Sequence, residues 1–293
     1  MTPRSWLTGL ASAGLAAATI LTIPASAPAA AGAGDVSVNI IGGTDATETY
    51  PYAVRLLTEY PGLGTGRCTG TLITAGGKVA VATNAHCVTD FDTAQPVPAT
   101  QVTVQYGSTH LDQLTSVAAA RIEVHPDWDW MTGNDPVADT AVIALPGGLN
   151  LTGIPLGTAA DPGRPVRLLG WGRTTLDAAE PPPVLKQLDT RITGPSACAT
   201  AGITAGEICV AARQGAAPCF GDSGGPALAR NGRLWTLLGT ASRETNDTCT
   251  GATIYTDTSH YASWITDAVT ARQPYCPRRV AAGAAVRYSH TIS

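Results

Sequence analysis

Three short segments of the chain hold a hydroxyl, an imidazole and a carboxylate, each in a setting that could serve covalent catalysis. Ser223 stands in Gly221–Pro226, where glycines let the backbone turn sharply and present main-chain N–H groups to a ligand. His86 lies in Thr83–Cys87 at the end of an apolar run, and Asp139 directly precedes another apolar run. A serine hydroxyl becomes a useful nucleophile when a histidine removes its proton and an acid orients that histidine.

Each segment alone also has a structural explanation. A glycine-rich segment with one serine can be a tight turn, a single histidine is more often a hydrogen-bonded structural residue, and an aspartate can cap a strand. Asp135 competes with Asp139 for the acidic role, but Asp135 precedes Pro136 rather than an apolar strand, so Asp139 is favoured. The occurrence of all three segments in one chain favours catalysis.

The elements that must position these residues are mostly short strands. The chain contains 32 glycines and 21 prolines, and loops that carry them separate runs of apolar or alternating residues. Ala75-Gly76-Gly77 between two such runs predicts a hairpin. Strands are expected at 70–74, 78–83, 101–106, 121–124, 141–145, 166–171, 185–192, 234–240 and 253–256. Regularly spaced short strands indicate a β-barrel or β-sandwich.

One helix is predicted near the C-terminus, with Ser259 as a candidate N-cap. Its single apolar stripe consists of Tyr261, Trp264, Ile265, Ala268 and Val269. The 293 residues, 44% of them hydrophobic, suffice for one large domain with a buried core. The net charge of −4 gives no electrostatic reason to expect binding to nucleic acid.

The N-terminus has the pattern of a secretory signal peptide. Arg4 precedes the apolar run Trp6–Ile23, and small residues follow it. A membrane anchor is the alternative, which the marginal length of the apolar run disfavours. Cleavage is left open between the sites after Ala27, Ala29, Ala31 and Ala33, although Pro28 argues against the first. The mature protein is therefore expected to be secreted, extracellular and free of the membrane, where cysteines form disulfides.

Further motifs accompany the three segments, namely Ile40-Ile41-Gly42-Gly43, Gly170-Trp171-Gly172, Glu207-Ile208-Cys209 and Tyr261-x-x-Trp264-Ile265. With the order His86, Asp139, Ser223, the sequence resembles the chymotrypsin-like (trypsin-fold) family of secreted serine endopeptidases from Ile40 to about Val269. The resemblance implies an all-β fold of two packed antiparallel six-stranded β-barrels with a C-terminal helix. The implied division is a signal peptide (1–31, its end between 27 and 33), a pro-segment (32–39), a protease domain (40–271) and a tail (272–293).

The resemblance also implies a role for each residue of the three segments. Ser223 is the nucleophile, His86 the general base and then the general acid, and Asp139 the group that orients His86. The N–H groups of Gly221 and Ser223 form the oxyanion hole. Ser242 supports Asp139 and begins the strand that pairs with substrate.

Activation in this family begins with a cut before the residue matched by Ile40. The new ammonium group turns inward and pairs with the carboxylate matched by Asp222, which orders the oxyanion loop. Asn39 departs from the Arg or Lys usual before that bond, so trypsin-like activation is in doubt. An activating protease that tolerates Asn, or self-cleavage, is the expected route.

The specificity pocket departs from that of trypsins. Ala217, followed by Pro218, stands where trypsins place a buried Asp, so a basic side chain has no partner at the pocket base. The resemblance assigns Phe220, Ser242, Arg243, Glu244 and Thr253 to substrate binding as well. Larger residues at Glu244 and Thr253 predict an elastase-like pocket for small or medium apolar P1 residues. Glu244 is interpreted as a solvated rim carboxylate; the alternative is that it turns inward and accepts a basic residue.

Seven cysteines cannot all pair within one chain. The resemblance implies the disulfides Cys68–Cys87, Cys198–Cys209 and Cys219–Cys249, and it leaves Cys276 in the tail. No cofactor and no metal site are expected, because Cys-x-x-Cys spacing is lacking and the histidines are scattered.

Protein or peptide substrates are the expected partners, and the chain is expected to act as a monomer. Two other functions compete with a peptidase. A non-catalytic binding relative usually lacks the His or Ser that this chain retains. An esterase or lipase usually carries Gly-x-Ser-x-Gly, which differs from Asp222-Ser223-Gly224-Gly225-Pro226.

Overall fold

The structure, a computed structural model, describes residues 40–129, 138–158 and 161–271. The expected signal peptide, the pro-segment with Asn39, the competing acid Asp135 and the tail with Cys276 lie outside the described residues. Within the described ranges, no helix is long and apolar enough to cross a lipid bilayer.

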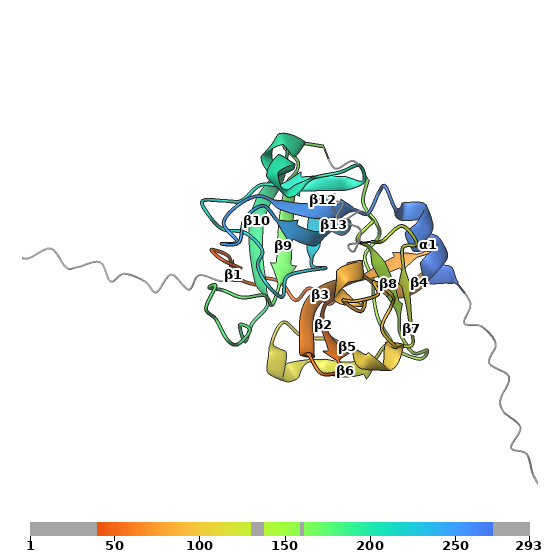
Figure 1. The fold of residues 1–293 in the computed structure, drawn as a ribbon. Coiled ribbons are helices and arrows are strands. Elements are labelled where there is room, and N and C mark those ends of the chain that lie inside the picture. The colour runs from red at the N-terminus through yellow and green to blue at the C-terminus, as the bar shows by residue number, and fades with distance from the viewer. Residues whose placement is uncertain (1–39, 130–137, 159–160, 272–293) are drawn as a thin grey trace, which may run out of the picture. The chain divides into compact units, whose positions relative to one another are not determined.

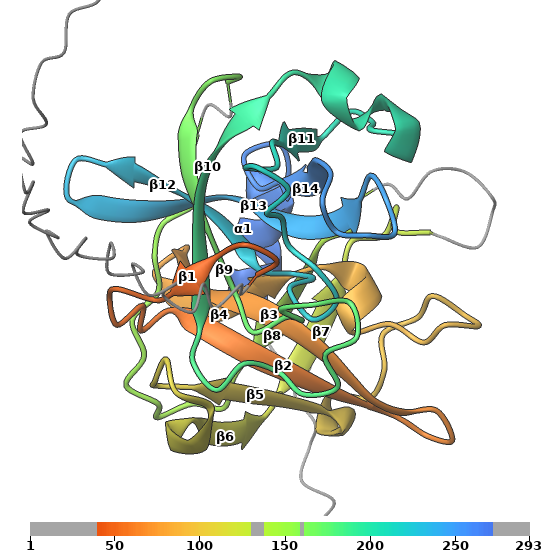
Figure 2. The same ribbon diagram turned by 90° about the vertical axis from the view of Figure 1, so that its left-hand side faces the viewer.

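The described strands form two antiparallel seven-stranded sheets (Figures 1 and 2). The first sheet has the strand order β6-β5-β2-β3-β4-β8-β7. Its strands are β2 (Ala53–Tyr60), β3 (Gly64–Ala75), β4 (Lys78–Thr83), β5 (Val102–Tyr106), β6 (Thr115–Ala118), β7 (Arg121–Val124) and β8 (Ala141–Ala144). Its buried side chains form one continuous hydrophobic cluster that includes Val54, Leu72, Val81 and Ile143.

The second sheet closes on itself because β10 pairs with both β9 and β11. The strands β9 to β14 thus form a six-stranded barrel, and the short β1 is added at β10. The strands are β1 (Thr44–Asp45), β9 (Pro165–Gly170), β10 (Lys186–Thr193), β11 (Glu207–Val210), β12 (Pro226–Asn231), β13 (Leu234–Glu244) and β14 (Thr253–Asp257). The buried core of this barrel includes Ile40, Leu168, Ile208 and Tyr255.

The expected fold class is confirmed, with one six-stranded barrel closed by strand pairing and a curved half-barrel as its partner. Helix α1 (Ala262–Thr270) packs beside β4 and β8 (Figure 1). Its apolar stripe buries Ile265, Ala268 and Val269 as expected. The helix differs at its start, where Tyr261 is the N-cap and Ser259 instead donates a hydrogen bond to Asp257.

The β3–β4 hairpin turns at Gly76 and Gly77, whose φ angles of 54° and 74° suit residues without a side chain. The expected strands recur with shifted ends, and the sequence reasoning missed β1, β2, β6, β11 and β12. The missed strand β12 begins at Pro226, directly after two glycines, so its sequence is typical of a turn. Four short 3₁₀ helices connect described strands: Ala85–Cys87, Ala99–Gln101, Leu111–Gln113 and Pro195–Ala201.

Candidate active site

His86 and Asp139 meet because two neighbouring strands bring their flanking residues to one end of the first sheet. β4 pairs with β8, with Thr83 opposite Ala141. His86 lies on the 3₁₀ helix that follows β4, and Asp139 lies just before β8. The Asp139 carboxylate is about 1% exposed, whereas the His86 side chain is 19% exposed. The histidine ring therefore has access to solvent while its acidic partner has almost none.

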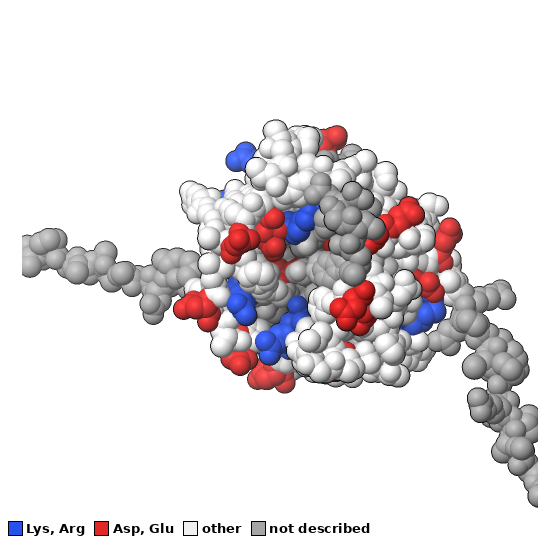
Figure 3. Space-filling model, viewed as in Figure 1, with Lys and Arg blue, Asp and Glu red and all other residues white. Residues whose placement is uncertain are grey.

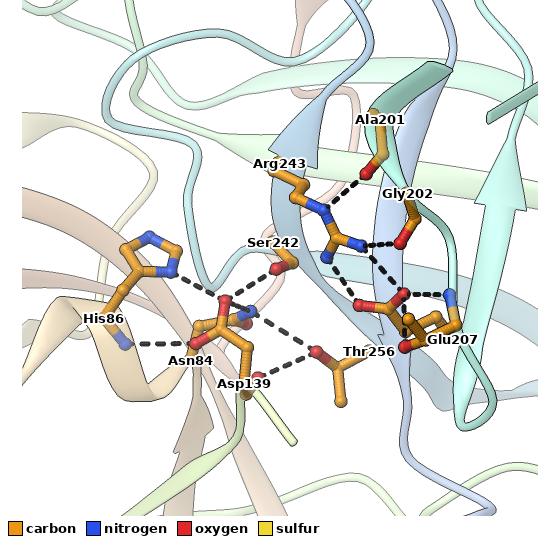
Figure 4. A network of polar contacts seen from close by, with 10 residues as sticks. Asn84, His86, Asp139, Ala201, Gly202, Glu207, Ser242, Arg243 and Thr256 are labelled. Atoms are coloured by element: carbon orange, nitrogen blue, oxygen red, sulfur yellow. Dashed lines mark hydrogen bonds and ion pairs between the residues drawn. The ribbon is translucent and has the colours of Figure 1, made fainter. Parts of the chain in front are cut away.

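The Asp139 carboxylate binds both the ring and the backbone of His86 (Figure 4). Its Oδ2 lies 2.8 Å from His86 Nδ1, and its Oδ1 accepts the His86 backbone N–H at 3.0 Å. These two contacts hold the ring plane, and an Nδ1–H that donates to Asp139 leaves Nε2 free to accept a proton.

Three further polar groups hold Asp139 in place (Figure 4). Asn84 Nδ2 and Ser242 Oγ donate hydrogen bonds to Asp139 Oδ2, at 2.8 and 2.6 Å. Thr256 Oγ1 donates to the Asp139 backbone carbonyl at 2.7 Å. Ser242 and Thr256 come from β13 and β14, so the closed barrel anchors a residue of the first sheet.

Electrostatics set the protonation states of the pair. Burial alone would raise the pKa of Asp139, but the neighbouring His86 and the hydrogen bonds from His86, Asn84 and Ser242 outweigh it and lower that pKa. Burial alone would lower the pKa of His86, but the Asp139 charge and hydrogen bond, together with the Glu244 charge, raise it above 6.5. Asp139 is therefore ionised near neutral pH, and His86 is a stronger base than an isolated imidazole.

Ser223 is presented from a loop that the first sheet holds in place. The Thr69 N–H donates to the Ser223 carbonyl at 2.8 Å, and Thr69 Oγ1 donates to the Gly221 carbonyl at 3.0 Å. Among the described residues, no hydrogen bond joins Ser223 Oγ to His86. Such contacts are often long in an enzyme without substrate and tighten in the reacting complex.

The peptide N–H groups of Gly221 and Ser223 donate no hydrogen bond to any described group. The Phe220 carbonyl is held by the Arg173 N–H at 2.8 Å. Since the carbonyl and N–H of a trans peptide point in opposite directions, the Gly221 N–H points away from Arg173. Gly221 has a φ of 99°, which glycine adopts without strain. Two unpaired N–H groups beside a serine hydroxyl form a suitable cradle for an oxyanion.

Asp222 lies buried beneath this loop in a space shaped by glycine. Its Oδ1 accepts the Gly172 N–H at 2.8 Å, and its Oδ2 accepts the Cys219 N–H at 2.9 Å. A Cβ added at Gly170 would lie 1.9 Å from Asp222 Oδ1, and one at Gly172 would lie 2.4 Å from Asp222 Cγ. The two glycines of the Gly170-Trp171-Gly172 motif thus make room for this carboxylate.

Burial raises the pKa of Asp222 to about 7, opposed by its two backbone hydrogen bonds and assisted by the Glu244 charge. Within the described residues, no ion pair neutralises Asp222. The Ile40 side chain is buried in the core of the closed barrel, and the Ile41 carbonyl accepts the Ala217 N–H. Ile40 has a φ of 39°, an unusual value for a β-branched residue.

The expected pocket residues fall into two groups, those whose side chains lie at the expected pocket and one, Arg243, whose side chain points elsewhere. Ala217 is buried, and Glu244 lies directly opposite Thr253 in the pairing of β13 with β14. Thr253 Oγ1 is buried without a hydrogen-bond partner. The Glu244 carboxylate forms no ion pair with another described residue, and burial raises its pKa. Phe220 is 54% exposed at the edge of the site.

Arg243 belongs to the other group, because its guanidinium points toward Glu207 and away from His86 and Asp139 (Figure 4). It forms a two-pronged ion pair with Glu207, at 2.5 and 2.9 Å. It also donates to the carbonyls of Ala201 and Gly202, at 2.9 and 2.8 Å. Only the backbone of Arg243, on β13, can therefore line the pocket as expected. Its guanidinium is paired with Glu207 and offers no charge to a substrate.

The structure contains the three disulfides that the resemblance implies, Cys68–Cys87, Cys198–Cys209 and Cys219–Cys249. Cys68, Cys87 and His86 form the one cluster of metal-ligating residue types among the described residues. Its two cysteines are joined to each other, so they offer no thiolate to a metal.

Sequence reasoning missed two groups of supporting residues. Asn84 and Thr256 contact Asp139, and Glu207 pairs with Arg243. Asn84 lies two residues before His86, a position from which the sequence could have suggested a role. Thr256 carries no local signal, and the Glu207-Ile208-Cys209 motif gave Glu207 no role, because only the pairing of distant strands brings these two residues to the site.

Comparisons with known proteins show which family the chain resembles. A family model described as Trypsin matches residues 40–265. Serine protease SP24D of Anopheles gambiae is 31% identical over 235 residues, which cover 77% of this chain and 79% of that protein. Chymotrypsin-2 of Vespa crabro is 30% identical over 65% of this chain and 83% of its own length. Human chymotrypsin-like elastase family member 1 is 27% identical, over 80% and 94%.

Proposed function

Because the chain belongs to the trypsin family and is a serine endopeptidase, we propose that it cleaves peptide bonds through Ser223, His86 and Asp139. The observation that carries this assignment is the Asp139 carboxylate, which is buried and lies 2.8 Å from His86 Nδ1. A carboxylate so placed holds the imidazole in the tautomer that can take a proton from Ser223.

The reaction proceeds in two halves through an acyl-enzyme. Ser223 Oγ attacks the substrate carbonyl while His86 Nε2 takes its proton, and the resulting oxyanion accepts hydrogen bonds from the Gly221 and Ser223 N–H groups. His86 then protonates the leaving amine. This amine is the new N-terminus of the C-terminal fragment, which departs. Water then attacks the ester between Ser223 and the acyl fragment, again with His86 as the base, and Ser223 is regenerated.

Activity should be low until the chain is cut before Ile40. The buried Asp222 carboxylate has no cationic partner among the described residues, and its raised pKa records the cost of that isolation. An ammonium group at Ile40 would supply the missing charge and steady the loop that holds Gly221 and Ser223. Secretion by a signal peptide within residues 1–31, a pro-segment at 32–39, a protease domain at 40–271 and a tail at 272–293 complete the proposal.

The activity of the protein that begins at Ile40 should depend on pH with a bell shape. His86 acts as a base only when neutral, so kcat/KM rises as the pH passes through the pKa of His86. That pKa is raised above 6.5, mainly by Asp139. The alkaline limb falls where the Ile40 ammonium deprotonates, above about pH 8. Initial rates between pH 5 and 10 on a neutral peptide measure both limbs. Undiminished kcat/KM at pH 5 would contradict the role of His86.

The pocket should accept small or medium apolar P1 residues. Ala217 offers no charge at the base, and Thr253 faces Glu244 across the β13–β14 pair. Cleavage of a peptide library by the Ile40-started protein tests function and pocket together, with cuts expected after residues such as Ala or Val. A dominant preference for Arg or Lys that is lost in Glu244→Gln would instead assign a basic-P1 role to Glu244. A folded protein that cuts no peptide would overturn the proposed function itself.

A further inference from the structure

We propose that this enzyme favours substrates with an acidic residue at the second position after the scissile bond, and that Arg67 and Arg173 select it. The inference rests on the proposed function and adds a substrate class to it. It follows from a cavity of about 180 Å³ beside the oxyanion loop. The residues of its lining that matter here are Arg67, Trp171, Arg173, Glu180, Phe220 and Gly221.

The cavity lies on the side where the leaving group must sit. Arg67 precedes Cys68, whose disulfide reaches Cys87, the neighbour of His86. His86 protonates the leaving amine, so the chain after the scissile bond passes on this side of Ser223. The acyl part of the substrate lies on the opposite side, along β13 at Ser242. Gly221 belongs to both the oxyanion cradle and the cavity lining, so the cavity begins where the reacting carbonyl sits.

Both arginines are exposed and have no carboxylate partner among the described residues. Arg67 lies on β3, opposite Leu57 of β2. One group of Lys and Arg side chains lies to the lower left of centre on the face in Figure 3, beside the position of β2 in Figure 1. The whole chain has a net charge of −4, so two arginines without an ion-pair partner give the region beside the reacting bond a positive charge on an otherwise acidic protein.

Arg173 is held in position by its own neighbours. Its N–H binds the Phe220 carbonyl at 2.8 Å, and its Nη1 donates to the Leu176 carbonyl at 2.9 Å. Its guanidinium carbon lies 5.5 Å from the centre of the Phe220 ring, within the range of a cation–π contact. A guanidinium ordered in this way keeps donors available for a carboxylate. The acidic residue of the lining, Glu180, is itself exposed and forms no ion pair with a described residue.

Two peptides that differ only in Glu or Gln at the second residue after the scissile bond test the proposal. We expect the Ile40-started enzyme to cleave the Glu peptide about tenfold faster in kcat/KM, because the attraction is partly screened by solvent. The ratio should fall as salt rises. Arg67→Gln/Arg173→Gln should bring the ratio to about one; the ratio rather than the absolute rate is the readout, because the Arg173 side chain also contacts Leu176 and Phe220. The matched control Arg233→Gln, at an exposed hairpin, should keep the wild-type ratio.

The outcomes separate the preference from the catalytic function. Hydrolysis of the Gln peptide reports the proposed function alone, whatever the ratio. A wild-type ratio near one, or a ratio that survives the double substitution, overturns the acidic preference and leaves the endopeptidase standing. Failure to cleave either peptide, with native circular dichroism, overturns both. Because Arg67 and Arg173 are both exposed, the double variant should fold, and single variants give an independent measurement of each contribution.

Discussion

Replacing Ser223 with Ala is expected to lower kcat for peptide hydrolysis by about 10⁶-fold, and to abolish labelling by a fluorophosphonate probe. Without the hydroxyl no acyl-enzyme forms, and only the oxyanion cradle and substrate binding remain to accelerate direct attack by water. Circular dichroism should be unchanged, because Ser223 contributes a backbone carbonyl, rather than its side chain, to the contact with Thr69.

Steady-state rates on one peptide, at protein concentrations determined by absorbance, check this result. Ser116→Ala, at an exposed serine on β6, is the matched control and should keep full activity. His86→Ala should cost about as much as Ser223→Ala, and the double variant little more, because the two residues act in one step. A Ser223→Ala enzyme that kept a hundredth of the wild-type rate would remove Ser223 from the mechanism.

Asp222→Asn in the Ile40-started protein is expected to lower kcat/KM by about 10²- to 10³-fold. The substitution removes the proposed carboxylate partner of the Ile40 ammonium. It also replaces one carboxylate oxygen by an NH₂ group, so one of the backbone N–H groups of Gly172 and Cys219 loses its acceptor. The loop with Gly221 and Ser223 then loses its support. A wild-type chain left uncut before Ile40 should be similarly weak.

Asp267→Asn, at an exposed position on α1, provides the control and should leave kcat/KM unchanged. N-terminal sequencing of the active protein is needed alongside the rates, since the prediction concerns the form that begins at Ile40. Full activity of the uncut chain, or of Asp222→Asn, would show that the buried carboxylate plays no part in activation.

Local patterns predicted the parts of this molecule that depend on neighbouring residues. The alternation at 101–106 predicted β5, the Gly76-Gly77 turn predicted the β3–β4 hairpin, and the apolar stripe predicted α1. Strand β12 escaped prediction because its sequence near Pro226 is typical of a turn. Its extended conformation is imposed by pairing with β13 and β9.

The candidate site divides in the same way. The settings of His86, Asp139 and Ser223 are local, so the sequence could single them out, and the structure places the first two in contact. The Arg243–Glu207 pair could not be foreseen, because an arginine on β13 and a glutamate on β11 meet only through β14, which pairs with both strands. The catalytic roles of His86, Asp139 and Ser223 stay predictions until the variants are measured.

The backbone of Ile40 gives the proposed activation a direction. A φ of 39° at a β-branched residue is a strained value that costs about 1–3 kcal/mol. That angle is defined by the peptide bond before Ile40, so cutting the bond abolishes the strain altogether. In the proposed activation, release of this strain would therefore add to the pairing of the new ammonium with Asp222 in favouring the cut form over the joined one.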